Sequence, residues 1–443
     1  MTRAPLLPVR NGRKPSPGSP LEGNAHDRLL AAVVALVARD GYAELTVERL
    51  QLRAGVSRAS FYQYFTNLED CFSSAYREHA ERLTRELDAA ADASEDRELA
   101  VLRALVDAAL ARPDVARLLM LEGLAAGAAG LRERDVLIAR IALAMTGAAG
   151  RVRKIDLPAA VLIGAVFRFI AIRLAQAGVA DTLREEVCDW ATAFARRPSQ
   201  RRWGERLAPA LPDEAQRALA APKRARRARA GDSARQRVLH ATAALIFEKG
   251  YTGLTVVDIV AAAGVSRRSF YNEFTGKVDA FEAAYEYGFE QVMAACAPAF
   301  FAPGTWPERV WQAAQAFTRF MASEPLIAHL GFVECHAIGP RFEPRVHDTQ
   351  LAFTLFLEEG YRQRLEGRSL SRACSALTAA AVLEAGFRAS RYGASLYVRS
   401  MQPLAVYIAL TPFVGADEAG GFVAEKLAAR ACPTLVQAIS PSR

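Results

Sequence analysis

The chain repeats part of itself, and this repeat constrains its fold more than any other feature. Residues 41–76 recur as residues 250–285 at a constant offset of 209 positions (250 − 41 = 209). Across residues 28–76, roughly half of the positions match the second copy without a gap. A single repeat over so long a period indicates two duplicated domains, because solenoid units recur several times at short periods.

Composition agrees with two helical domains. At 443 residues, each half of the chain is long enough to form its own core, and a hydrophobic content of 51% suffices to fill both. Apolar positions recur with helical rather than alternating spacing along almost the whole chain. The sequence therefore predicts an all-α fold.

The net charge of +8 is concentrated in two acid-free segments. Their nine basic residues are Arg3, Arg10, Arg13 and Lys14 near the start and Lys223, Arg224, Arg226, Arg227 and Arg229 between the halves. Without them the rest of the chain is close to neutral (8 − 9 = −1). The charge therefore indicates two basic flexible segments rather than a basic folded surface. The second cluster either follows nucleic-acid phosphates or is an ordinary solvated linker.

Cysteine usage and hydropathy favour a cytoplasmic protein. Six cysteines are scattered without a Cys-x-x-Cys pair, and the first residues lack the apolar core of a signal peptide. Reduced thiols are therefore expected. Residues 157–177 approach the length of a membrane span, but Arg168 and Arg173 interrupt them. Because a charge in mid-bilayer is costly, we expect a buried interface helix and no membrane association.

The first copy has the caps and turns of three successive helices. Residues 28–39 carry apolar side chains at helical spacing. Thr46 caps a second helix through its hydroxyl, and Gly55 permits the tight turn that ends it. Ser57 then caps a third helix over residues 58–64. Two helices joined by such a turn form a helix-turn-helix, whose last helix enters the major groove of DNA.

The third helix of each copy presents polar side chains that suit DNA. Arg58 can fork onto guanine and Gln63 onto adenine, whereas Phe61 and Phe65 face inward as core. Thr46 and Tyr62 are better placed for phosphate oxygens. In the first copy, which we call the first reader, we expect contacts from Thr46, Ser57, Arg58, Ala59, Ser60, Tyr62, Gln63 and Tyr64. In the second copy, the second reader, we expect them from Thr255, Ser266, Arg267, Arg268, Ser269, Tyr271 and Asn272. The alternatives are that Arg58 is a solvated surface charge and that Tyr62 and Tyr271 belong to the core.

The two readers share a longer pattern of caps, turns and aromatic residues. It runs from Leu45-Thr46-Val47 to Asp70-x-Phe72, and again from Leu254-Thr255-Val256 to Asp279-x-Phe281. In this pattern each copy resembles the tetracycline-repressor (TetR/AcrR) family of bacterial transcription regulators. The resemblance implies two tandem units, each a helix-turn-helix domain followed by a helical ligand-binding and dimerisation domain. It also implies a double-stranded DNA operator, a repressor role and control by a small effector, with no cofactor.

The expected domains follow from this resemblance. They are a basic arm (1–24), the first reader (25–72), a first regulatory domain (73–196), a basic linker (197–232), the second reader (233–281), a second regulatory domain (282–432) and a tail (433–443).

The readers depart from the family pattern, and from each other, at a few positions. Where the family often places Lys against a phosphate, the second reader has Lys277, which we add to the expected DNA contacts, but the first has Leu68. Glu273 in the second reader occupies the position that corresponds to Tyr64 in the first. A carboxylate there repels phosphate, although it can accept from a cytosine amino group. We therefore expect the two readers to prefer different bases.

Two unlike readers on one chain raise the question of how they pair. Members of the family are homodimers on palindromes, because operator symmetry mirrors protein symmetry. We expect the halves to pair within the chain as a pseudo-dimer, through residues 157–178 and 183–194 of the first half and residues 370–392 and 401–413 of the second. The competing arrangement is a homodimer of tandem chains with four readers.

The resemblance implies an effector pocket in the helical remainder of each half, but the sequence does not identify the effector. Possible pocket walls in the second half are Phe332, Phe353, Phe356 and Phe387, which are equally well explained as core.

No motif of a catalytic site is recognisable, so we do not expect an enzyme. The side chains of metal-ligand type that lie closest in sequence are His329, Glu334, Cys335, His336 and His347, and helical spacing spreads them over different faces. The leading alternative function is that one reader has decayed, leaving a ligand-sensing or dimerisation module with a single working reader.

Overall fold

A computed structural model describes residues 23–147, 150, 153–174, 182–197, 199–208, 233–363, 370–391 and 401–431. Nearly all of the basic arm, most of the basic linker, the tail and the far ends of two expected interface helices lie outside these residues. Within them the chain is helical apart from turns and one antiparallel bridge, between Ile155 and Ala195. The predicted all-α fold is confirmed.

The elements of the first half begin with the three helices predicted for the first reader, and further helices follow them. They are α1 (Ala25–Asp40), η1 (Tyr42–Glu44), α2 (Val47–Ala54), α3 (Arg58–Tyr64), α4 (Leu68–Asp92), α5 (Arg97–Ala111), α6 (Pro113–Arg117), η2 (Leu118–Glu122), α7 (Gly123–Ala125), α8 (Gly127–Thr146), α9 (Ala159–Leu174), α10 (Leu183–Thr192) and α11 (Gly204–Leu207).

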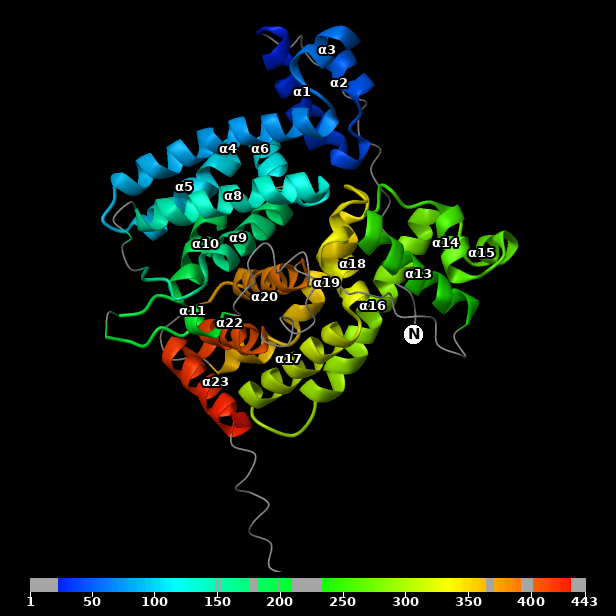
Figure 1. The fold of residues 1–443 in the computed structure, drawn as a ribbon. Helices are drawn as coiled ribbons and strands as arrows, with labels where there is room; N and C mark the ends of the chain where they lie inside the picture. Colours follow the sequence, from blue (N-terminus) through cyan, green and yellow to red (C-terminus); the bar gives the residue numbers. More distant parts are fainter. Residues whose placement is uncertain are drawn as a thin grey trace, which may run out of the picture.

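The second half repeats this plan. Its elements are α13 (Ala234–Lys249), α14 (Val256–Ala263), α15 (Arg267–Glu273), α16 (Lys277–Phe300), α17 (Trp306–Ser323), α18 (Pro325–Phe332), η4 (Glu334–His336), α19 (Glu343–Thr354), η5 (Glu358–Arg362), α20 (Ala373–Arg391), α22 (Gln402–Val414) and α23 (Ala416–Ala431). The two readers lie at the periphery, at the top and at the right in Figure 1, and both regulatory domains lie between and below them.

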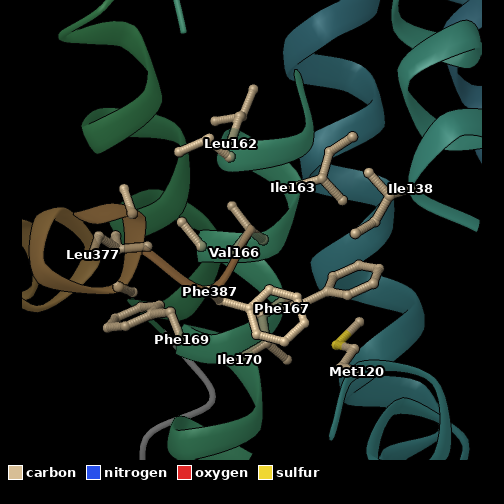
Figure 2. Packing of buried hydrophobic residues seen from close by; sticks show 14 of the residues in the cluster. Met120, Ile138, Leu162, Ile163, Val166, Phe167, Phe169, Ile170, Leu377 and Phe387 are labelled. Carbon is tan, nitrogen blue, oxygen red and sulfur yellow. The ribbon is translucent and has the colours of Figure 1, made fainter. Parts of the chain in front are cut away.

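The two halves share one hydrophobic core. It extends from the first reader through both regulatory domains, whereas the second reader packs in a separate cluster with residues of α18 and η4. At the centre, α9 lies against α20 (Figure 1). Figure 2 shows Leu377 and Phe387 of α20 among Val166, Phe167 and Phe169 of α9. The halves are therefore packed against each other through buried apolar side chains.

The flanking helices α10 and α22 complete this contact. Trp190 of α10 donates from Nε1 to Thr378 Oγ1 of α20 at 3.1 Å. The Tyr407 hydroxyl of α22 donates to Asp156 Oδ2 in the first half at 3.2 Å, and the Tyr407 ring packs on Phe194. The helices expected from the sequence to pair across the halves are thus the ones that meet there, as far as residues 174 and 391, where their described parts end.

A buried carboxylate lies inside the same contact. Glu384 of α20 is fully buried and accepts two hydrogen bonds from Arg134 of α8, at 3.0 and 3.1 Å, and one from Arg168 of α9 at 3.0 Å. Burial opposes its ionisation, but the two guanidinium groups outweigh that effect and hold the pKa of Glu384 below its ordinary value. A side chain at Gly164 would occupy the same space, since its Cβ would lie 2.3 Å from Glu384 Cδ.

None of the helices described here combines the length and the apolar character needed to cross a bilayer. In α9, the segment considered for a membrane span, residues 161–170 are buried within the protein, and Arg168 among them is 9% exposed.

Candidate nucleic-acid interface

The third helix of each reader exposes the predicted contact side chains and buries its aromatic core. In α3, Arg58, Tyr62 and Gln63 are exposed, Ser60 is half-buried, and Phe61 is fully buried. The exposed set continues with Ala59 and Tyr64. In α15 the corresponding residues Arg267, Arg268, Tyr271, Asn272 and Glu273 are exposed, and Ser269 is half-buried. Tyr62 and Tyr271 are 48% and 57% exposed, so neither is a core residue.

Hydroxyl groups fix where the helices of each reader begin. Ser57 Oγ accepts from the Ser60 N–H at 3.1 Å, and Ser266 Oγ accepts from the Ser269 N–H at 3.0 Å. At the second helix of each unit, Thr46 and Thr255 accept from the N–H three residues later, at 3.2 Å in both readers. These four predicted contact residues therefore act first as N-caps. Their contact with phosphate stays a prediction.

The turn between the two helices is the same in both readers. Gly55 and Gly264 adopt left-handed conformations, with φ of +63° and +60°, which a side chain would disfavour. The carbonyl just before each glycine is held by an arginine of the first helix, which the sequence analysis did not single out. Arg28 Nε donates to Ala54 O at 2.9 Å, and Arg237 Nε donates to Ala263 O at 3.1 Å. The repeat itself could have pointed to these arginines, since they occupy matching positions in the two copies (237 − 28 = 209).

The difference between Tyr64 and Glu273 is matched by a second difference on the first helix. In the first reader the His26 ring stands edge-on to Tyr64, with ring centroids 5.7 Å apart, and stacks on Phe65. In the second reader Arg235 takes the place of His26 and pairs with Glu273 at 3.5 Å, over the ring of Phe274. The Glu273 carboxylate thus has a cationic neighbour that offsets its repulsion of phosphate. Both partners are about half exposed, so the pair itself contributes little to stability.

Lys277 begins α16 and is held locally. Its ammonium donates to the Leu254 carbonyl at 3.1 Å and lies 4.8 Å from the centre of the Tyr251 ring. In the first reader, Leu68 instead packs against the hydrophobic core. A phosphate contact by Lys277 stays a prediction, with two of its three N–H donors not used by this hydrogen bond.

The charges on the two helix-turn-helix units differ. Helices α2 and α3 carry three arginines and one glutamate (3 − 1 = +2), whereas α14 and α15 carry two arginines, one aspartate and one glutamate (2 − 2 = 0). With the first helix of each reader included, α1–α3 and α13–α15 each carry five basic and three acidic residues (5 − 3 = +2), so the difference is confined to the helix-turn-helix pairs.

A glutamate, buried in the first half and half-buried in the second, ties each reader to its regulatory domain. Glu122, in the π-helical turn η2, accepts from the Tyr42 N–H at 2.8 Å, and Glu334, in η4, accepts from the Tyr251 N–H at 3.2 Å. Burial raises the pKa of Glu122 to about 7, although Arg117, 2.7 Å away, opposes the rise. Arg117 also pairs with Glu343 of the second half. Glu122, which holds the first reader, is thus linked through Arg117 to the second half.

The remaining candidates from the sequence are dispersed. His329 packs on Phe247 and lies 3.8 Å from Glu334, while His336 contacts Arg168. Across the described residues no three side chains of metal-ligand type come together. Phe353 and Phe356 line a small apolar cavity of about 70 Å³ in the second half, and Phe332 lines another of about 60 Å³. The guanidinium carbons of Arg134 and Arg168 each lie 5.4 Å from the centre of the Phe387 ring, and Phe387 lines neither of these cavities.

Comparison with known proteins identifies the two readers. Residues 29–75 and 238–284 each match the family model for bacterial regulatory proteins of the tetR family. The matches begin 209 residues apart (238 − 29 = 209), which is the offset of the repeat. A crystal structure assigned to a TetR-family transcriptional regulator of Syntrophomonas wolfei is 15% identical, covering 46% of this chain and 97% of that one, with a TM-score of 0.30. No curated protein sequence matches the chain.

Proposed function

We propose that this chain, a two-copy member of the tetR family of bacterial regulatory proteins by the match of both readers, binds its operator as a single-chain pseudo-dimer. As a member of this family it is a DNA-binding transcriptional regulator. In our proposal each reader contacts its own half-site, the operator is asymmetric, and a small effector modulates the affinity. The proposal includes a repressor role in the cytoplasm, as the family resemblance implies.

The observation that carries the proposal is the shared core between the halves. Family homodimers bring two readers together by pairing two chains, whereas here α9 and α20 already pair within one chain. Within this contact Glu384 of the second half forms ion pairs with Arg134 and Arg168 of the first half. A second copy of the chain is therefore not needed to bring two readers onto one duplex.

The unlike readers support an asymmetric operator. Gln63 and Asn272 occupy matching positions in the two readers, and both can bind adenine. At two other matching positions the readers differ: Ala59 corresponds to Arg268, and Tyr64 corresponds to Glu273. Arg268 can donate two hydrogen bonds to guanine, whereas Ala59 at the matching position has only a methyl group. The two readers are therefore expected to bind half-sites of different sequence.

Selection of bound duplexes from a random pool, by the full chain at a stated salt concentration, tests this function. We expect two dissimilar half-sites about one helical turn apart. Enrichment of a palindrome would instead indicate homodimers that use a single reader. If no sequence were enriched, sequence-specific binding itself would be contradicted.

The alternative that one reader has decayed is favoured by Glu273 in the second reader and by Leu68, where the family often has Lys, in the first. Separate Arg58→Ala and Arg267→Ala variants discriminate, with the selected duplex as probe and fluorescence anisotropy as readout. If both readers bind DNA, each variant loses about 1–3 kcal/mol of binding free energy for the selected duplex. Each variant then also loses base preference only in the half-site of the reader that carries the substitution. An Arg267→Ala chain with unchanged affinity would show that the second reader does not contribute.

A further inference from the structure

A cavity of about 360 Å³ lies between the two halves, outside both readers. Its first-half wall includes Met120, Leu124 and Ile172, and its second-half wall includes Pro340, Pro344 and Val346. This volume falls within the range of ligand pockets, and its lining is mainly apolar, as such pockets usually are. The cavity therefore suits an apolar small molecule.

Two basic side chains in the lining have donors that no group in the described chain accepts. Arg168 donates from Nε to Glu384 and from Nη1 to His336 Nε2 at 3.2 Å, but its buried Nη2 has no partner. Because an arginine only donates, His336 must accept at Nε2, so this ring is neutral with its proton on Nδ1. His336 Nδ1 is also buried without a partner. Buried donors usually have an acceptor, so these two nitrogens offer hydrogen bonds to an acceptor group in the cavity.

The charge behind this wall is unbalanced. Arg134 and Arg168 share the single carboxylate of Glu384, and the three side chains are 1%, 9% and 0% exposed. The cluster therefore holds one buried positive charge in excess (2 − 1 = +1). On the opposite side of the lining Glu343 is acidic, and Arg117 pairs both with it and with Glu122. Because burial raises the pKa of Glu122 to about 7, Arg117 balances the charge of Glu343 below that pH. An anion in the cavity would compensate the excess charge.

The walls of the cavity belong to the turns that hold the readers. Met120 lies in η2, whose Glu122 accepts from the first reader's Tyr42 N–H, and His336 lies in η4, whose Glu334 accepts from the second reader's Tyr251 N–H. Pro340 in the lining also packs on Gly41 of the first reader. A ligand that shifts these walls acts on both readers at once.

We propose that the cavity between the halves binds one apolar organic anion per chain, with its carboxylate at Arg168 and His336. This inference rests on the proposed function, because the bound anion is the effector that changes operator affinity. The ligand contacts both halves, so one molecule serves both readers.

Isothermal titration of the full chain tests the site directly. The probes are two apolar carboxylates of different shape, decanoate and 2-naphthoate, each beside its neutral counterpart, decan-1-ol and 2-naphthol. We expect at least one carboxylate to bind once per chain and at least about tenfold more tightly than its alcohol. If neither carboxylate binds, or if the alcohols bind equally well, the proposal is overturned.

Variants locate the binding. Ala171→Trp fills the cavity between the halves, and Ala314→Trp, the matched control, fills the smaller apolar cavity inside the second half. Only Ala171→Trp should lose binding, with thermal unfolding used to show that both variants fold. His336→Leu removes an unpaired donor and should reduce the preference for carboxylate over alcohol. Unchanged binding by Ala171→Trp would place the ligand elsewhere.

Operator titrations separate this inference from the proposed function. Anisotropy of the selected duplex, with and without the bound carboxylate, should show a changed affinity. Ligand binding without that change would overturn the regulatory role of the site. Ligand binding by a chain that selects no duplex would leave the site standing and contradict the proposed function.

Discussion

Glu384 illustrates how a single residue joins the halves. Its carboxylate is shared by arginines from two helices of the other half, and Gly164 of α9 leaves the space that its side chain fills. The sequence placed residues 157–178 at the contact between the halves, but it did not indicate that a carboxylate of the other half fills the space beside Gly164. That pairing spans 250 residues for Arg134 and 216 for Arg168, and no local pattern encodes it.

Adding a methyl group at Gly164 tests this packing. In Gly164→Ala the new Cβ would meet the Glu384 side chain, so we expect a loss of about 1–3 kcal/mol in the free energy of unfolding, measured by urea denaturation. Gly421→Ala is the matched control, because nothing lies within 4 Å of that position in α23. The control should be unchanged or slightly more stable. Equal stability of the two variants would contradict the packing.

At the scale of elements, local signals explain what the sequence could predict. The third helix was expected over residues 58–64 and α3 spans those residues, because Ser57 and Gly55 specify its start within a few positions. The attachment of the readers was not predictable in this way. Glu122 and Glu334 lie 80 and 83 residues from the tyrosines whose N–H groups they accept, in turns without a distinctive pattern.

The pKa of Glu122 predicts how this attachment depends on pH. Between its ordinary value of 4.5 and about 7, the folded chain keeps a proton that the unfolded chain has released. Stability therefore falls as pH rises through this window, by up to about 3 kcal/mol. Glu122→Gln still offers an acceptor to the Tyr42 N–H but does not ionise. Urea denaturation should show that the free energy of unfolding of the variant rises relative to that of the wild-type chain between pH 5 and pH 8. A difference in unfolding free energy that stays constant over this range would contradict the raised pKa of Glu122.

For the whole molecule, the described contacts favour one chain as the working unit. The interface helices were expected from the sequence to pair, and α9, α10, α20 and α22 do meet between the halves. The shared cavity and the Arg117 pairing with Glu343 arise only from that arrangement, so the sequence could not indicate them.

Sedimentation of the free protein should therefore give the mass of a single chain, 48.1 kDa. The halves already cover each other's apolar interface, which leaves that surface unavailable to a second chain. A species of only twice that mass would favour the homodimer with four readers.

The most direct test counts the chains on one operator. Native mass spectrometry of the full chain with its selected duplex should show one chain per duplex, because both readers of a pseudo-dimer occupy the two half-sites. A complex that always contains two chains would contradict the single-chain account.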